Sequence, residues 1–296
     1  MQLLKEIVVA VDFSPNSKNA LLQAIRLAGH HEANVRAVHV VESETLGALA
    51  KAMGTEAERM ETDSVKRARA RLRAFLEETG VVGDVKSIVR IGDPFEEIMT
   101  EVRAHTAELL VLGSRGATGG SRGASVLATK CIRTAQTNVL VVRRAHTTPY
   151  TKVCAILDFS KTSQDVLRDA LFIAKCDQAN LHVCHIHIPP WESSNYLSPA
   201  AVPLPEERDE YRAELLTRLR QEVEPFEEEA RGLQVDYDLV EGPLRIVAID
   251  EEIEKAGVDL VVLSTRGRTG LRRFLFRTVA EHVVRASPCS VLVIRS

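Results

Sequence analysis

The sequence lacks any long apolar segment and any excess of basic charge. Of its 296 residues 27% are charged, and no window approaches the roughly 18 consecutive apolar residues of a membrane-spanning helix. Its 38 Lys and Arg residues are balanced by 41 Asp and Glu residues, whereas a dedicated nucleic-acid-binding protein carries a strong basic excess. We therefore expect neither a membrane nor a nucleic acid among its partners.

Cysteine is also scarce. The chain has five cysteines, an odd number, and no C-x-x-C pair. This usage is typical of a reducing compartment rather than of a disulfide framework, and we interpret the thiols as small buried groups. The segment from Met1 to Asp12 runs directly into a strand pattern without signal-peptide architecture. We therefore expect a cytoplasmic protein.

Common catalytic and metal-binding motifs are absent as well. The sequence contains no H-E-x-x-H, no G-x-S-x-G and no paired motif for acyl transfer. His182, Cys184, His185 and His187 alternate between the two faces of one predicted strand, so each face offers only two ligands. Two ligands do not close a zinc site, and we interpret these side chains as part of the core.

What the sequence does contain is an internal repeat. Ile7–Ser14 (IVVAVDFS) returns as Val153–Ser160 (VCAILDFS), which places Asp12 and Asp158 146 residues apart. Three later landmarks recur in the same order, at separations that rise only to 152 residues: Asp93-Pro94 with Gly242-Pro243, Gly116 with Gly267, and Val139–Val142 with Val291–Ile294. Such a small drift indicates duplication. We predict two domains, residues 1–146 and 147–296.

Each half alternates short apolar runs with longer amphipathic stretches, which is typical of βαβ units around a parallel sheet. The predicted strands are 7–11, 35–41, 85–91, 109–112 and 139–142 in the first half, and 153–157, 180–188, 233–240, 260–263 and 290–294 in the second. Ser14-Pro15 and Asp93-Pro94 each combine a capping side chain with proline, a pattern that begins a helix. We interpret 56–78 and 206–231 as solvated helix faces, and 42–54 and 189–205 as loops or lids.

A glycine-rich loop follows the fourth strand of the first half. Gly113–Gly123 contains five glycines in eleven residues. At the carboxyl end of a parallel sheet, backbone N–H groups of such a loop and the next helix N-terminus are suited to phosphate. A plain flexible turn is the alternative, because the loop matches neither a Walker nor a dinucleotide pattern.

Together, the strand that ends in Asp-Phe-Ser, the G-x-x-G after the fourth strand and the closing V-L-V-V strand resemble the universal stress protein family. The resemblance covers nearly the whole chain, twice. It implies two doubly wound α/β domains, each with a five-stranded parallel sheet of strand order 3-2-1-4-5. It also implies that an adenine nucleotide, ATP or ADP, alone or with Mg²⁺, binds across the ends of strands one, two and four.

The family's phosphate signature is G-x-x-G, nine further residues, and then Gly followed by Ser or Thr. The first half keeps Gly113 and Gly116, but Val126 stands in the place of the later glycine, and Ser125 beside it is the candidate for the hydroxyl position. The glycine that comes before the hydroxyl residue of the signature is therefore missing from this half.

The second half departs from the signature in other places. It has Ser264 for the first glycine, keeps Gly267, replaces the later glycine by Arg277 and keeps a hydroxyl in Thr278. An arginine there either fills the space of the phosphates or binds an anion as a bidentate donor. We favour the first interpretation.

The family's adenine contacts map onto Asp12 and Val40 in the first half, and onto Asp158 and Ile186 in the second. The two aspartates also have a purely structural interpretation, as acceptors that tie the loop after the first strand. The spacing alone does not separate these two roles.

Two functions from different classes follow. The first is a stress-response binding and regulatory module that takes an adenine nucleotide, more tightly in the first domain. The alternative is a nucleotide-free scaffold with vestigial phosphate loops that engages protein partners. We expect a binding protein rather than an enzyme, with weak ATP hydrolysis as its upper limit, because no catalytic base is identified.

The fifth strands carry an expectation about assembly. Val139–Val142 and Val291–Ile294 are apolar on both faces, yet the family's strand order puts the fifth strand at a sheet edge. The resemblance implies dimers joined through this strand. We expect the two fifth strands of one chain to meet as an internal pseudo-dimer, with a homodimer of chains as a further level.

Overall fold

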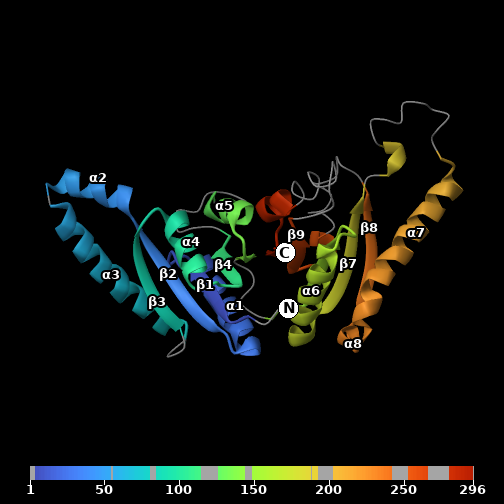
Figure 1. Ribbon diagram of the computed structural model, residues 1–296, viewed down its shortest axis with the longest axis horizontal. Helices are drawn as coiled ribbons and strands as arrows, with labels where there is room; N and C mark the ends of the chain where they lie inside the picture. The colour runs from blue at the N-terminus through green and yellow to red at the C-terminus, as the bar shows by residue number, and fades with distance from the viewer. Residues whose placement is uncertain are drawn as a thin grey trace. The chain divides into compact units, whose positions relative to one another are not determined.

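The computed structural model divides into two compact units, residues 2–148 and 149–296. The structure describes residues 4–54, 56–80, 85–114, 126–143, 149–187, 189–192, 203–241, 253–265 and 280–295. In each unit, strands alternate with helices along the chain (Figure 1). No helix in these described ranges is long and apolar enough to cross a membrane.

The first unit is built on a five-stranded parallel sheet. Its strands are β1 (Glu6–Ala10), β2 (Asn34–Glu42), β3 (Val85–Gly92), β4 (Leu109–Gly113) and β5 (Asn138–Val142). They pair in the order β3-β2-β1-β4-β5. The central strands β1 and β4 are apolar on both faces and buried, as a sheet covered by helices on both sides requires.

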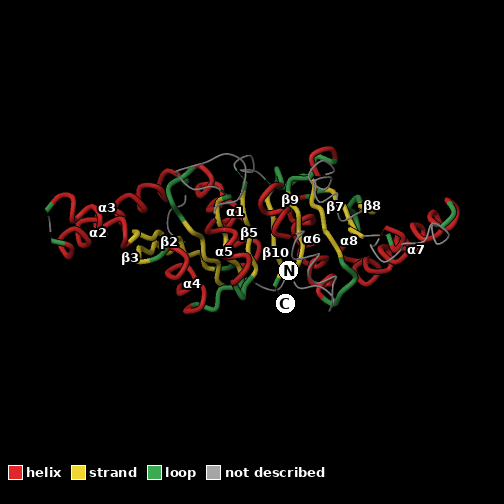
Figure 2. The backbone as a smooth tube through the Cα atoms, turned by 90° about the horizontal axis from the view of Figure 1, so that it is seen from above, coloured by secondary structure: helices red, strands yellow, loops and turns green. Residues whose placement is uncertain are grey.

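Helices cover both faces of this sheet (Figure 2). They are α1 (Pro15–His31), α2 (Ser43–Met53), α3 (Ala57–Glu78), α4 (Pro94–Ala104) and α5 (Val126–Thr134). Right-handed crossovers put α1 and α3 on one face, and α4 and α5 on the other.

Both predicted helix starts in the first unit are confirmed. The Ser17 N–H donates to Ser14 Oγ at 3.1 Å, and the Glu96 N–H donates to Asp93 Oδ1 at 3.0 Å. These side chains satisfy N–H groups that have no partner inside the helix.

The second unit repeats this plan. Its strands are β6 (Lys152–Leu157), β7 (Asn180–His187), β8 (Val235–Glu241), β9 (Leu260–Ser264) and β10 (Ser290–Ile294), in the order β8-β7-β6-β9-β10. Its helices are α6 (Thr162–Asp177), η1 (Pro190–Glu192), α7 (Pro205–Val223), η3 (Glu224–Phe226) and α8 (Glu227–Ala230), with helical turns at 253–255 and 280–286. Both units therefore have the predicted strand order 3-2-1-4-5.

Two segment predictions need correction. The segment 42–54, expected as a loop or lid, contains α2, because Leu46 and Ala50 lie one turn apart and bury their side chains with Met60. The run 206–231 is not one helix: α7 ends at Val223, and Pro225, which has no N–H to donate, lies in the short turn η3 that follows. Residues 193–202 of the other expected loop lie outside the described part.

The five thiols are all free. Four of them are buried and Cys176 is partly exposed. The interpretation of the cysteines as buried hydrophobic groups is thus confirmed for four of the five.

Candidate functional site

The loop between the first strand and the first helix of each unit is tied by its aspartate. Asp12 follows β1, and its Oδ1 accepts a hydrogen bond from the Ser14 N–H at 3.0 Å. Asp158 follows β6, and its Oδ1 accepts from the Ser160 N–H at 3.0 Å. The structural role proposed for these residues is therefore present in both units, at the carboxyl end of the sheet.

Asp158 is held by a further pair of bonds. The Ser163 hydroxyl donates to Asp158 Oδ1 at 3.0 Å, and the Asp158 N–H donates to Ser163 Oγ at 3.3 Å. Only 8% of the residue is exposed. Within the described ranges Oδ2 has no hydrogen-bond partner, so this oxygen remains an acceptor for a ligand.

A phenylalanine follows each aspartate and packs against a histidine of the second strand. Phe13 and His39 have ring centroids 4.3 Å apart, and Phe159 and His185 have centroids 4.0 Å apart. Burial lowers the pKa of His39, and the charge of Arg71 lowers it further, so the neutral imidazole is favoured. The repeat of Asp-Phe-Ser was visible in the sequence, but the histidine partner was not, because it comes from a different strand.

Glycine at the end of β4 allows a close approach of the first helix. A Cβ atom at Gly113 would lie 2.8 Å from the Asn16 carbonyl carbon and 2.9 Å from the Ser17 nitrogen. Backbone atoms cannot move aside as a side chain can, so this glycine is required by packing. In the second unit, Ser264 occupies the end of β9 and is buried there.

The remaining phosphate-site predictions are only partly visible. Gly116, Ser125, Gly267, Arg277 and Thr278 lie outside the described residues. Val126 is the first residue of α5 and is 86% exposed.

The two predicted apolar base contacts lie near the carboxyl ends of their strands. Val40 is half-buried on β2 opposite Arg90 of β3, and Ile186 is buried on β7 opposite Val240 of β8. Both therefore flank the same end of the sheet as the aspartates.

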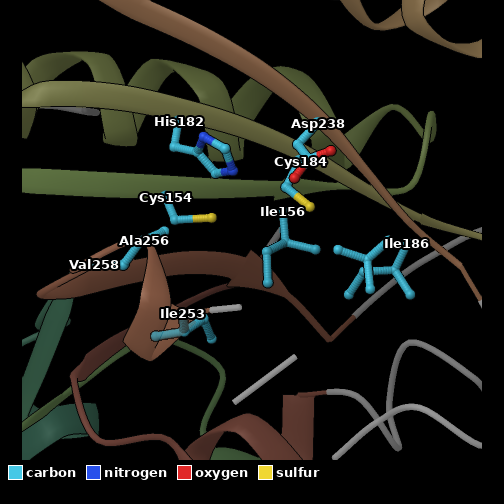
Figure 3. A pocket seen from close by; sticks show the side chains of 10 residues that line it. Cys154, Ile156, His182, Cys184, Ile186, Asp238, Ile253, Ala256 and Val258 are labelled. Carbon is cyan, nitrogen blue, oxygen red and sulfur yellow. The ribbon is translucent and has the colours of Figure 1, made fainter. Parts of the chain in front are cut away.

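A small cavity lies on one face of the second sheet (Figure 3). Its walls come from β6, β7, β8 and the segment 253–258: Cys154, Ile156, His182, Cys184, Ile186, Asp238, Val240, Ile253, Ala256 and Val258. The space open to a water-sized molecule is about 20 Å³, which is room for about one water. The cavity as it stands is therefore too small for a nucleotide.

Burial disfavours the thiolate form of Cys154 in this cavity. Burial raises the pKa of Cys154 well above its usual range, and the neighbouring Cys184 and Cys289 raise it further. Among the residues that the structure describes, no group of three or more His, Cys, Asp or Glu is placed to hold a metal ion.

The opposite face of β7 carries a row of rings that sequence analysis did not foresee. His187 lies 5.9 Å from His185 and 5.8 Å from Tyr211, and Trp191 lies 5.3 Å from Tyr211, all between ring centroids. This placement confirms that His185 and His187 share one face, whereas His182 and Cys184 line the cavity on the other.

The first unit has an aliphatic cluster at the same place. The neighbouring pair at the ends of β2 and β3 is Val41 and Ile91, whereas the register-matched pair in the second unit is His187 and Glu241. Burial lowers the pKa of His187 to about 4, with a further contribution from Arg212, which forms an ion pair with Glu241. The alternation of histidines along the strand was the signal that could have located this row.

Comparison with known proteins finds the same family in both units. The model of the universal stress protein family matches residues 4–143 and again residues 149–295. Universal stress protein MJ0531 of Methanocaldococcus jannaschii is 32% identical over 152 residues, covering 49% of this chain and 82% of that protein. Universal stress protein YxiE of Bacillus subtilis is 29% identical over 149 residues, covering 49% of this chain and 99% of that protein.

Solved structures share the fold along the whole chain. A universal stress protein from Archaeoglobus fulgidus has a TM-score of 0.61 at 20% identity, covering 98% of this chain and 96% of that one. A protein described as a universal stress protein from Pseudomonas aeruginosa has a TM-score of 0.65 at 19% identity, covering 99% and 94%. With two matches to the family model and the family's strand order in each unit, the chain belongs to the universal stress protein family, as a tandem member with two copies of the domain.

Proposed function

We propose that this chain binds an adenine nucleotide, ATP or ADP, and acts as a stress-response regulatory module. The observation that carries the proposal is the aspartate at the carboxyl end of the first strand in each unit, buried in the second unit and half-buried in the first. In Asp158 one carboxylate oxygen is used to fix the loop and the other is left without a partner in the described chain. A carboxylate fixed in this way is prepared to accept a bond from a base amino group or a ribose hydroxyl.

The rest of the site follows the sheet edge. Val40 and Ile186 supply apolar contact for a base next to the two aspartates. The phosphates are assigned to the loop after the fourth strand, whose last residue is Gly113 in the first unit and Ser264 in the second. We assign the chain to the cytoplasm, as its sequence leads us to expect.

We further propose that the first domain, residues 1–146, binds the nucleotide more tightly than the second, residues 147–296. The first keeps both glycines of G-x-x-G, whereas the second has Ser264 and Arg277. A side chain in the place of the later glycine takes space next to the phosphates, and we infer that Arg277 fills the second site instead of binding an anion there.

Calorimetric titration of the full chain with ATP tests the proposal. We expect Asp12→Ala to weaken binding about tenfold, because a lost hydrogen bond to a charged acceptor costs about 1.5 kcal/mol or more. We expect Asp158→Ala to affect only the weaker site. Asp165→Ala serves as the control, since Asp165 is on the exposed side of α6 and pairs with Arg168.

Two results would contradict the proposal. Unchanged affinity in a folded Asp12→Ala chain would remove this residue from the site. Absence of ATP and ADP binding by the parent chain at millimolar concentration would refute nucleotide binding altogether and favour the scaffold alternative.

One observation supports that alternative. Val126, which replaces the later glycine of the phosphate signature, is 86% exposed at the start of α5. The replacement of that glycine by valine is consistent with a vestigial phosphate loop, and a scaffold that engages protein partners needs no nucleotide.

A further inference from the structure

The loop that holds each candidate aspartate contains a phenylalanine in a strained conformation. Phe13 has a φ of 63° and Phe159 a φ of 58°, in the left-handed region. This conformation is strained for a bulky residue, whereas glycine adopts it freely. The presence of phenylalanine in both units indicates that the ring itself is needed.

Each ring contacts a histidine from the second strand and an arginine from the long helix before the third strand, which is α3 in the first unit and α7 in the second. In the first unit the His39 ring centroid lies 4.3 Å and the Arg71 guanidinium carbon 4.2 Å from the ring centroid of the phenylalanine. In the second unit the corresponding distances are 4.0 Å for His185 and 4.2 Å for Arg218. The strained residue is thus fixed by two contacts in each unit.

The same histidine also holds the backbone on the other side of the aspartate. His39 Nδ1 lies 2.8 Å from the carbonyl oxygen of Val11, and His185 Nδ1 lies 2.7 Å from that of Leu157. A carbonyl oxygen only accepts, so Nδ1 carries the proton and donates. Since these carbonyls belong to the residue directly before the aspartate, one imidazole fixes the loop both before and after it.

The surroundings of this arrangement differ between the units. Phe75 packs edge-on against the Phe13 ring at 5.6 Å, whereas the position four residues after Arg218 is Glu222, whose carboxylate accepts from Gln164 at 2.9 Å. The neighbours have changed while the contacts of histidine, phenylalanine and arginine are the same. General packing of the helix therefore does not account for the contacts of histidine, phenylalanine and arginine that both units have.

We propose that His39 and His185 are positioning residues for ligand binding, which orient the carboxylates of Asp12 and Asp158 through the backbone before them and the phenylalanine after them. This inference rests on the proposed function of the two aspartates. In each unit the inference adds one histidine that acts without touching the ligand. This histidine is not among the family's signature positions as they map onto this sequence.

The test compares two variants of His39 in a full chain that also carries Asp158→Ala, so that ATP titration reports the first unit. His39→Asn keeps an N–H donor at the same distance from the backbone, because Nδ2 of asparagine and Nδ1 of histidine are both bonded to Cγ. His39→Leu keeps apolar bulk without a donor. Amide hydrogen exchange of Ser14, whose N–H donates to Asp12 Oδ1, is measured in the same chains without ATP.

We expect His39→Leu to weaken ATP binding about tenfold and to speed exchange at Ser14, and His39→Asn to stay within about threefold of the parent in both measurements. Unchanged affinity and exchange in a folded His39→Leu chain would overturn the proposal, as would equal losses in the two variants. If the parent binds no ATP, the proposed function fails by itself, and the exchange at Ser14 still decides whether His39 positions the loop. The matching His185 variants, read at Ser160, give the same decision if His39→Leu does not fold.

Discussion

A single buried carboxylate joins α4 to the edge strand β3 of the first unit. Glu101 is 1% exposed, and Arg90, itself 46% exposed, donates to its Oε1 from Nε at 2.7 Å. His105 is a second neighbour, with its Nε2 3.5 Å from Oε2. We expect Arg90→Ala to lower the free energy of unfolding by about 2 kcal/mol, because it leaves a buried charge poorly compensated.

Urea unfolding measures this effect, with Arg231→Ala as the matched control. Arg231 and Glu228 form an ion pair in which both side chains are 75% exposed, and such pairs contribute about 0.5 kcal/mol or less. Equal losses in the two variants would show that the burial of Glu101 carries no special energetic weight.

His187 makes the second unit sensitive to acid. Its pKa is about 4 in the folded chain, lowered from 6.5 chiefly by burial and then by Arg212. Between pH 6.5 and about 4 the unfolded chain therefore binds more protons than the folded one, and the free energy of unfolding falls as the pH is lowered. We expect a loss of about 1–3 kcal/mol between pH 7 and pH 4 from this residue.

The variant His187→Phe should flatten this pH dependence. Fluorescence follows the transition directly, because Trp191 is the one tryptophan of the chain and lies beside Tyr211, which contacts His187. The same slope with pH in the parent and in His187→Phe would contradict the assignment.

At the scale of elements, local sequence signals located most of the fold. The ten strands begin and end within two residues of the predicted limits, because their apolar runs are bounded by turns and caps. The caps at Ser14 and Asp93 were predictable for the same reason, since cap and partner lie three residues apart. The helix α2 was missed, because its two buried positions have meaning only against Met60 of the next helix.

The site was less predictable than the fold. The repeat of Asp-Phe-Ser identified both aspartates, but the strain at Phe13 and the contacts of His39 and Arg71 join residues that are far apart in the sequence. The row of rings that ends at Trp191 depends in the same way on the register of β7 and β8 and on the position of α7. Spacing along one chain does not encode such contacts.

The junction of β4 with α1 gives a prediction at this scale. Gly113→Ala places a Cβ atom against backbone atoms of Asn16 and Ser17, and we expect a loss of about 1–3 kcal/mol in stability. Gly29→Ala, within α1 and with nothing within 4 Å of the added atom, should instead stabilise the helix by up to about 1 kcal/mol. Thermal unfolding of the two variants measures both changes, and a neutral Gly113→Ala would contradict the packing role.

At the scale of the whole molecule, the fifth strands carry the prediction. Within their own units β5 pairs with β4, and β10 pairs with β9. We propose that Val139–Val142 and Val291–Ile294 join the two halves as an internal pseudo-dimer. Each fifth strand would then need no strand from another chain to cover its free edge. The combined substitutions Leu140→Asp and Leu292→Asp should then speed proteolysis between residues 143 and 150.

A matched control for this experiment is Leu49→Asp, since Leu49 is an exposed position of α2. Proteolysis at the same rate in the parent and in the double variant would contradict the pseudo-dimer. So would an experimental structure in which either fifth strand pairs with another element.

Photoaffinity labelling of the full chain with an azido derivative of ATP, followed by peptide mapping, tests the central claim most directly, because it reports both binding and place. The account predicts labelled peptides from residues 2–148 that unlabelled ATP protects and that Asp12→Ala loses, with weaker labelling of residues 149–296. Labelling that ATP does not reduce, or protected labelling confined to residues 149–296, would contradict it.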